Sequence, residues 1–263
     1  MDLPKIYENL GIDAFDISRQ HRDRLKSEGK FDEAVSLQYG EVDIMEFVNY
    51  LELNIPKDFT EDRTFVDIGC GTGKPVFAAA ASDCGFSKVI GIEIVPSLLD
   101  QAKAVHKQYL DCSARNNNCH IDLLEGDCFT FDSLWMDAAV LFLPITCFTS
   151  EMVQQCAEKI VNLVDKAYII TTSTIEDLVA LCDCEPRLKR IGKSVRLKYG
   201  KGKMEFSVFY KASKRKVQEP VVVGKEETEG KEGKECGDQN DNGKRQSRDD
   251  DNGMKNKSKR KKA

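Results

Sequence analysis

Glycine stands at every second position of residues 69–73, directly after a short apolar run, and this stretch limits what the chain can fold into. Residues 64–74 read Thr-Phe-Val-Asp-Ile-Gly-Cys-Gly-Thr-Gly-Lys. The apolar run predicts a buried parallel strand, and the segment that follows, residues 74–81, predicts a helix. A strand, a glycine turn and a helix together let a ligand lie against bare backbone at the carboxyl end of a central strand.

The spacing of these glycines separates three kinds of ligand site. A phosphate-binding P-loop requires Gly-x-x-x-x-Gly-Lys followed by Ser or Thr. Here an isoleucine occupies the first glycine position of that motif, and Pro75 stands where the hydroxyl residue should be. A dinucleotide-binding turn requires Gly-x-Gly-x-x-Gly, but Lys74 takes the place of the third glycine. An Asp-x-Gly-x-Gly-x-Gly pattern remains, with an acidic residue, Glu93, closing the next apolar segment.

Apolar and amphipathic segments alternate from residue 64 to residue 173, which predicts βαβ units and a parallel sheet. We expect strands at 64–69, 88–94, 121–125, 138–143 and 167–173, with helices at 74–82, 97–114 and 149–164. Two alternating segments, 194–199 and 205–211, predict a terminal antiparallel hairpin around a glycine-containing turn. Further helices are expected at 14–28, 44–53 and 176–182.

The glycine pattern strongly resembles the cofactor-binding turn of class I S-adenosylmethionine-dependent methyltransferases. These enzymes have a Rossmann-like α/β fold, in which a mostly parallel seven-stranded sheet ends in an antiparallel hairpin. The resemblance implies that Asp67 and the glycine backbone serve the methionyl end of the cofactor, and that Glu93 accepts hydrogen bonds from both ribose hydroxyls. It also implies that Asp127, after the third strand, accepts the adenine amino group, with Cys128 packed near the base. The implied contacts of the turn itself are Gly69, Cys70, Gly71, Gly73 and Lys74.

Each of these assignments has a plainer alternative. One Gly-x-Gly fits an ordinary turn between a strand and a helix, in which small residues are needed only for space. A Gly-Asp pair such as the one ending at Asp127 is common where a strand ends. Three alternating glycines with Asp67 and Glu93 in register favour the cofactor site over both.

A Tyr-Gly-Glu-Val sequence at residues 39–42 narrows the family. It precedes the glycine strand and opens a helix, and it closely resembles the histone methyltransferases of the disruptor of telomeric silencing family, in their short protist form. Those enzymes act on lysine 79 of histone H3 and lack the SET fold of other lysine methyltransferases. The resemblance spans about residues 36–212. It implies that Tyr39, Gly40, Glu41 and Val42 form a loop over the cofactor, with Glu41 near its amino group; otherwise Glu41 merely complements a helix dipole.

The chain departs from that family at the end of the strand predicted at 138–143. There the family has an asparagine beside the methyl group and the entering amine, whereas this chain has Pro144. Proline offers a carbonyl but no side-chain donor or acceptor. Three explanations are open: Thr146 and backbone carbonyls orient the nitrogen, the substrate differs, or catalysis is weak.

Methyl transfer from a sulfonium requires little acid–base chemistry. The protein must hold a neutral amine in line with the breaking bond, and such positioning supplies on the order of 7–11 kcal/mol of the barrier. A lysine amine, with an ordinary pKa of about 10.4, loses its proton more readily in an apolar channel. Phe148, Trp135 and Tyr210 are candidate channel residues, although aromatic residues at these places are more often part of the core. We assign no general base, because none of the three histidines falls at a strand end beside the glycine turn.

The charge pattern divides the chain. Residues 1–60 are expected to form a helical region carrying the 39–42 motif, residues 61–212 the methyltransferase domain, and residues 213–263 a disordered tail. The tail carries 15 Lys and Arg against 11 Asp and Glu, whereas residues 1–212 carry 24 against 33. An acidic body suits a basic protein substrate. The tail's end is a solvated segment, a nuclear import signal or a non-specific DNA contact through Lys257, Lys259, Arg260, Lys261 and Lys262.

Other features bound the class of protein. The chain has no apolar run of about 18 residues and no apolar leader at its start, so we expect no membrane span and a nuclear or cytoplasmic location. Its ten cysteines include no Cys-x-x-Cys pair, which predicts reduced thiols and no metal site.

The leading hypothesis is an S-adenosylmethionine-dependent protein-lysine methyltransferase that acts on a histone or nucleosome. A second hypothesis is a methyltransferase of a non-histone protein or small amine, which the proline at 144 would suit. A third is an inactive module that binds the cofactor and works as a chromatin interaction protein.

Overall fold

The computed structural model describes residues 2–57, 63–113, 119–172 and 188–213, all within one compact unit, Met1–Lys216. The predicted helix at 176–182 and the predicted tail lie outside the described residues. The elements in chain order are α1 (Leu3–Leu10), α2 (Ala14–Ser27), α3 (Phe31–Ser36), α4 (Ile44–Asn54), β1 (Thr64–Ile68), α5 (Lys74–Ala81), β2 (Lys88–Glu93), α6 (Pro96–Ser113), β3 (His120–Glu125), η1 (Cys128–Thr130), α7 (Asp132–Met136), β4 (Val140–Leu143), α8 (Ser150–Val161), β5 (Tyr168–Thr172), β6 (Leu188–Tyr199) and β7 (Gly202–Lys211).

A seven-stranded sheet runs through the centre of this unit, with strand order β3-β2-β1-β4-β5-β7-β6. The first five strands in this order are parallel to one another, and β7 pairs antiparallel with both β5 and β6. This confirms the predicted Rossmann-like α/β class, mostly parallel with an antiparallel terminal hairpin. Because β1 and β4 are neighbours, the strand order reverses beside β1, which is where ligands bind in such sheets.

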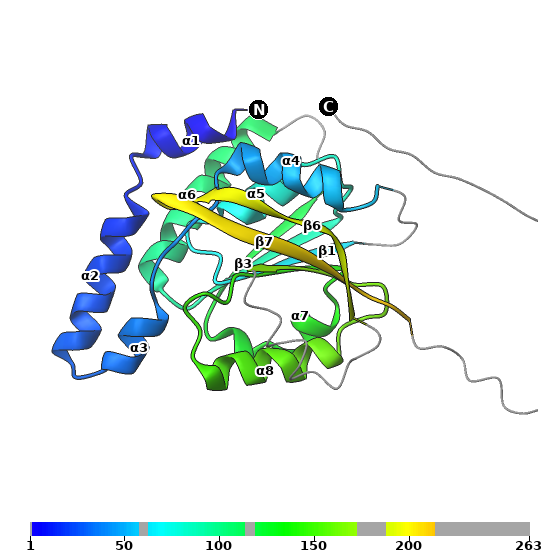
Figure 1. The fold of residues 1–263 in the computed structure, drawn as a ribbon. Coiled ribbons are helices and arrows are strands. Elements are labelled where there is room, and N and C mark those ends of the chain that lie inside the picture. The colour runs from blue at the N-terminus through cyan, green and yellow to red at the C-terminus, as the bar shows by residue number, and fades with distance from the viewer. Residues whose placement is uncertain (1, 58–62, 114–118, 173–187, 214–263) are drawn as a thin grey trace, which may run out of the picture. The chain divides into compact units, whose positions relative to one another are not determined.

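Helices cover both faces of the sheet (Figure 1), with α4, α5 and α6 on one side and α7 and α8 on the other. The side chains of β1 show why both faces are needed. Phe65 packs into the cluster beneath the first group of helices, and its neighbour Val66 packs into the cluster beneath the second. Successive side chains of a strand point to opposite faces, so a continuous apolar run is buried on both.

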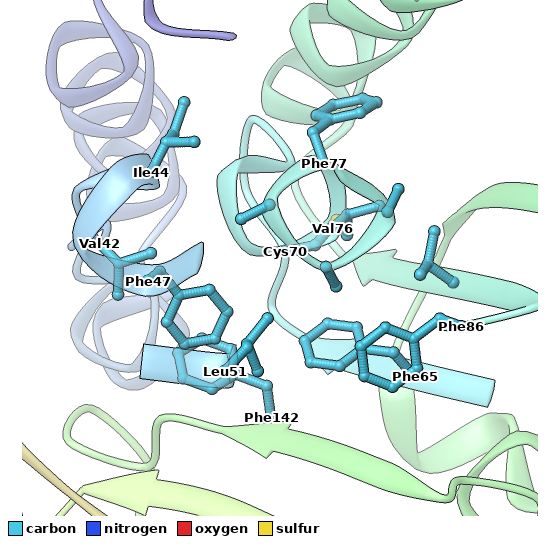
Figure 2. Packing of buried hydrophobic residues seen from close by; sticks show 14 of the residues in the cluster. Val42, Ile44, Phe47, Leu51, Phe65, Cys70, Val76, Phe77, Phe86 and Phe142 are labelled. Atoms are coloured by element: carbon cyan, nitrogen blue, oxygen red, sulfur yellow. The ribbon is translucent and has the colours of Figure 1, made fainter. Parts of the chain in front are cut away.

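Aromatic packing ties the N-terminal helices to this sheet. Figure 2 shows Phe47 and Leu51 of α4 facing Phe65 of β1 and Phe142 of β4. The ring centroids of Phe47 and Phe142 are 4.8 Å apart, and all four of these side chains are buried. Such aromatic pairs stabilise a core by about 0.5–1.5 kcal/mol beyond the area that they bury. The packing fixes α4, and with it the residues that precede α4, against the sheet.

Side-chain caps set the starts of several helices. The carboxylate of Asp13 accepts from the backbone N–H of Asp16 at the start of α2, and Asp43 accepts from Met45 and Glu46 at the start of α4. Capping of this kind stabilises a helix by about 1 kcal/mol. Four short helical elements, α1, α3, η1 and α7, were not predicted from the sequence, and β6 begins at Leu188 where the hairpin was expected to begin at residue 194.

The structure also bears on the cysteines, the possible metal ligands and the apolar helices. Six cysteines in the described part of the chain are free thiols: Cys70, Cys84, Cys119, Cys128, Cys147 and Cys156. Among the residues that the structure describes, no group of three or more His, Cys, Asp or Glu side chains is placed to hold a metal ion. Nor does the described portion contain a helix long and apolar enough to cross a bilayer.

Candidate functional site

A cavity of about 350 Å³ opens at the carboxyl ends of the parallel strands. The register of β1, β2 and β3 brings the ends of these strands to one edge of the sheet, where Glu93 pairs with Glu125. The predicted site residues that line the cavity are Tyr39, Gly40, Gly69, Glu93, Asp127, Cys128, Pro144 and Thr146. Glu41, Val42, Cys70 and Lys74 line a smaller cavity of about 20 Å³ that shares Tyr39 and Gly40 with the first.

The glycine turn has the backbone conformation that its sequence requires. Gly69, Gly71 and Gly73 have φ angles of +75°, +56° and +84°, a region that other residues rarely adopt. The backbone N–H groups of Gly69 and Cys70 both donate to the carbonyl of Ile92, at 2.9 and 3.0 Å, which ties the turn to the end of β2. Gly71 and Gly73 line neither cavity. They lie against protein instead, Gly71 beside the ring of Tyr39 and Gly73 beside the ring of Phe77.

Glu93 joins the glycine turn to the second strand. Its Oε2 accepts from the backbone N–H of Gly71 at 2.7 Å, and its Oε1 accepts from the N–H of Val95 at 2.8 Å. Burial raises the pKa of this carboxyl, and the backbone donors oppose that shift. Each carboxylate oxygen has lone pairs to spare, so Glu93 can accept further hydrogen bonds from a ligand in the cavity that it lines.

We expect Glu93→Gln to lower both stability and cofactor affinity. The amide nitrogen would face a backbone N–H, leaving a buried donor unpaired at a cost of about 1–3 kcal/mol. Losing a charge-assisted bond to a ligand hydroxyl should weaken binding roughly 10- to 100-fold. Thermal melting and calorimetry measure the two effects. The matched control is Glu125→Gln on the adjacent strand, because Glu125 is exposed; similar losses in both variants would contradict this role for Glu93.

Asp67 presents an unusual electrostatic situation. Its side chain is 1% exposed, and neither carboxylate oxygen has a hydrogen-bond partner among the described residues. Burial first, and then the nearby Glu93 carboxylate, raise the pKa of Asp67 well above its ordinary value. Buried carboxylates are nearly always paired. A cationic or hydrogen-bond-donating group of a bound ligand would supply the partner that the protein does not.

A polar network joins the 39–42 loop to the glycine turn and α5. The Tyr39 hydroxyl donates to Oε2 of Glu41 at 2.7 Å, and Lys74 Nζ lies 2.5 Å from Oε1 of the same carboxylate. Lys74 also lies over the ring of Tyr7, whose hydroxyl donates to the carbonyl of Thr72 at 2.9 Å. The network is largely shielded from solvent, with Lys74 22% and Glu41 17% exposed. Sequence reasoning missed Tyr7 because nothing in its segment signalled contact with a turn 65 residues away.

Asp127 and Cys128 form another part of the cavity wall. Asp127 is exposed, and its Oδ1 accepts from the N–H of Phe129 at 2.9 Å, which caps the short η1 helix. One carboxylate oxygen therefore has a structural role in a residue that also lines the cavity. Burial raises the pKa of the Cys128 thiol to about 12, so it is a neutral packing group. Phe129 and the half-exposed Ile94 add apolar surface on this side.

The far side of the cavity is built by the segment after β4 and by the hairpin. Pro144, Thr146, Cys147 and Phe148 line it together with Tyr199, which sequence reasoning missed. Tyr199 bridges to Val42 in antiparallel fashion, and the N–H of the next residue donates to the carbonyl of Glu41 at 2.8 Å. No local pattern could have signalled this pairing, because the partners are about 160 residues apart.

Only glycine fits at position 40 opposite this tyrosine. A Cβ atom placed on Gly40 would lie 2.1 Å from Cε1 of Tyr199. The hairpin thus packs directly on the 39–42 loop.

Two of the three aromatic residues predicted for the substrate channel do not line the cavity. Trp135 is fully buried in the cluster on the α7 and α8 side of the sheet, and its Nε1 donates to the carbonyl of Cys128. Tyr210 packs against Tyr168 in the sheet. Phe148 lines the cavity as predicted.

A protein-family model described as "Histone methylation protein DOT1" matches residues 19–197. Solved structures of several methyltransferases are similar in fold. TrmN from Thermus thermophilus has 12% identity, a TM-score of 0.45, and coverage of 64% of this chain and 48% of its own. The precorrin-6y C5,15-methyltransferase of Geobacter metallireducens has 12% identity, a TM-score of 0.43, and coverage of 64% and 86%. A methyltransferase from Geobacter sulfurreducens has 14% identity, a TM-score of 0.42, and coverage of 74% and 88%.

Proposed function

Because this chain belongs to the DOT1 family of histone methylation proteins and is therefore an S-adenosylmethionine-dependent methyltransferase, we propose that its substrate is a lysine side chain of a histone, of the type at position 79 of histone H3. The family match, which covers about two thirds of the chain, is the observation that carries this proposal. A nuclear location follows from the same proposal. The acidic charge balance of residues 1–212, with 24 Lys and Arg against 33 Asp and Glu, suits a basic protein partner.

We propose one orientation for the cofactor in the cavity. We assign Glu93 to the ribose hydroxyls, Asp127 to the adenine amino group, and the apolar side chains of Ile94 and Phe129 to the faces of the base. Asp67 and the 39–42 loop would hold the methionyl end. The cavity lining supports the roles of Glu93, Asp127 and the two apolar side chains. Asp67 lines neither cavity, and its role is supported by its buried, unpaired carboxylate.

When bound, the cofactor supplies a methyl group on a sulfonium, which is already activated for transfer. Glu93, Asp127 and Asp67 would hold the cofactor so that this methyl group passes to a neutral lysine nitrogen, with the pair of the broken C–S bond left on sulfur. The nitrogen must be neutral before attack, and its proton leaves to solvent. We propose that Tyr199, Thr146 and Phe148 form the wall along which the amine enters, where their apolar surface disfavours the charged amine.

Pro144 lies in this wall where the family pattern has asparagine. Its carbonyl can accept hydrogen bonds, and the hydroxyl of the exposed residue Thr146, which accepts from the Cys147 thiol at 3.8 Å, can also donate one. We propose that these two groups orient the neutral amine. Burial raises the pKa of the neighbouring Tyr199 phenol, so Tyr199 remains a neutral donor at physiological pH.

We propose that Lys74, which lines the smaller cavity, binds the carboxylate of the methionyl end. It opens α5, where the helix dipole also favours an anion, and Glu41 neutralises it in the described structure. We expect Lys74→Met to weaken binding of S-adenosylmethionine about tenfold. Binding of methylthioadenosine, which lacks the amino-acid end, should not change. Calorimetry with both ligands measures this, and Lys88→Met, which removes a lysine paired with Asp122, is the control. Equal losses for both ligands would count against the assignment.

The substrate proposal is tested by incubating the purified protein with nucleosomes, free histones and cell extract in the presence of labelled S-adenosylmethionine. Mass spectrometry then locates the methyl group. Methyl-lysine on a histone supports the proposal. Label on another protein or a small amine would retain the enzyme and reject the histone substrate, whereas cofactor binding without transfer to any acceptor would favour the interaction-module hypothesis.

A further inference from the structure

The β6–β7 hairpin carries a dense group of positive charges on an otherwise acidic body. Between residues 189 and 203 there are seven exposed Lys and Arg side chains: Lys189, Arg190, Lys193, Arg196, Lys198, Lys201 and Lys203. No acidic residue falls within this segment. We call these seven side chains the hairpin patch. The rest of residues 1–212 holds 17 Lys and Arg against 33 Asp and Glu, so the patch reverses the local sign of the charge.

The outer part of the hairpin extends beyond the sheet. Pairing of β7 with β5 ends at Phe206, whereas pairing of β7 with β6 continues to Gly202. Residues 196–205 are therefore a two-stranded ribbon past the end of β5, and Figure 1 shows β6 and β7 as the longest arrows of the sheet. One face of the ribbon packs inward through Leu197 and Tyr199, and alternation places Arg196, Lys198 and Lys203 on the other face.

The outward face holds like charges in direct opposition. Lys198 pairs across the ribbon with Lys203, an arrangement that destabilises a hairpin. In the described part of the chain, Arg196 is the one member of the hairpin patch with a carboxylate within 4.0 Å, its Nε lying 3.7 Å from Glu205. Glu46 also contacts the ribbon, and its Oε2 accepts from the backbone N–H of Lys198. An external anion would offset the repulsion.

We propose that the hairpin patch binds the phosphate backbone of double-stranded DNA. Charge complementarity supports a polyanion, and a two-stranded ribbon has the size that a major groove admits. The choice of DNA over an acidic protein rests on the proposed function, because a nucleosomal substrate lies against DNA. The patch flanks the cavity through Tyr199, which lies between Lys198 and Lys201, so bound DNA would run beside the entrance for the substrate amine.

The test uses the full chain and a labelled DNA duplex of about 30 base pairs, with binding followed by fluorescence anisotropy over a range of salt concentrations. The variant replaces Lys198, Lys201 and Lys203 with glutamine. The control replaces Lys26, Lys30 and Lys57 with glutamine, which removes the same charge at exposed lysines that each have a carboxylate partner. Thermal melting checks folding, and the variant should melt no lower than the wild type because the Lys198–Lys203 repulsion is gone.

We expect the variant to bind DNA at least tenfold more weakly than the wild type at about 100 mM salt. The slope of log affinity against log salt concentration should fall by an amount equal to the release of up to about three fewer counterions. The control should match the wild type in both measurements. Equal binding by variant and control would overturn the proposal. So would a variant that loses binding to labelled polyglutamate of equal charge but keeps DNA binding, because the patch would then fit an acidic protein. These measurements need no methyl transfer, so their outcome is independent of the histone assay.

Discussion

Asp67→Asn should stabilise the ligand-free protein and abolish cofactor binding. The wild-type carboxylate is buried without a partner in the described structure, so folding must either desolvate its charge or protonate it. A neutral amide avoids that penalty, and we expect a gain on the order of 1 kcal/mol, or about 2–4 °C in Tm. The bound cofactor would lose its counter-charge at the amino-acid end, for which we expect at least a 100-fold loss of affinity.

The raised pKa of Asp67 also predicts how stability and binding depend on pH. Between the unfolded and folded pKa values the folded state binds more protons, so stability falls as pH rises through that window and is constant above it. A cationic ligand favours the carboxylate, so its binding should release a proton and strengthen as pH rises through the same window. Calorimetry in two buffers of different ionisation enthalpy measures the release, which Asp67→Asn should reduce.

Asp122→Asn is the matched control for both effects. Asp122 lies in β3, its carboxylate is paired with Lys88 and His120, and these partners lower its pKa although burial opposes the shift. Its replacement should lower Tm slightly and leave cofactor affinity unchanged. If Asp67→Asn lowers Tm as Asp122→Asn does, Asp67 has a structural partner, and the assignment of its carboxylate to the cofactor is wrong.

The part of this site that the sequence could predict is the part encoded locally. The apolar run before Asp67 identifies a buried strand, the alternating glycines a turn with positive φ angles, and Glu93 the end of the next strand. Parallel strands end at one edge of a sheet, so local elements and the sheet order together place Gly69 and Glu93 at one cavity, with Asp67 and the rest of the glycine turn beside it. The same reasoning places Asp127, which follows the third strand, at this cavity.

The part that could not be predicted depends on contacts between distant segments. Tyr199 reaches the cavity because a hairpin near the end of the described chain packs on Gly40, and Tyr7 reaches the glycine turn from the first helix. Aromatic residues pack in cores as well as in sites, and a sequence pattern does not separate the two, as Trp135 shows. Alternation indicates the face of a strand from which a side chain points, but the distant segment that it contacts is fixed by tertiary packing.

Gly71→Ala should abolish cofactor binding and destabilise the fold, for two reasons that can be separated. Gly71 has a φ of +56°, and an added Cβ would lie 2.6 Å from Cε2 of Tyr39. The backbone strain alone should cost about 1–2 kcal/mol. Displacing the Tyr39 ring should break its hydrogen bond to Glu41 and move the 39–42 loop over the cavity, for which we expect at least a 100-fold loss of affinity for S-adenosylmethionine.

Gly85→Ala isolates the first of these reasons. Gly85 has a φ of +74°, but a Cβ placed on it meets no atom within 4 Å. Its replacement should therefore lower the free energy of unfolding by the strain alone and leave cofactor affinity unchanged, as thermal melting and calorimetry can measure. A third variant, Tyr39→Ala in the Gly71→Ala background, removes the clash and should recover part of the lost stability but not the affinity. If Gly71→Ala binds the cofactor as well as Gly85→Ala does, the close approach of Tyr39 to the glycine turn has no part in shaping the cofactor site.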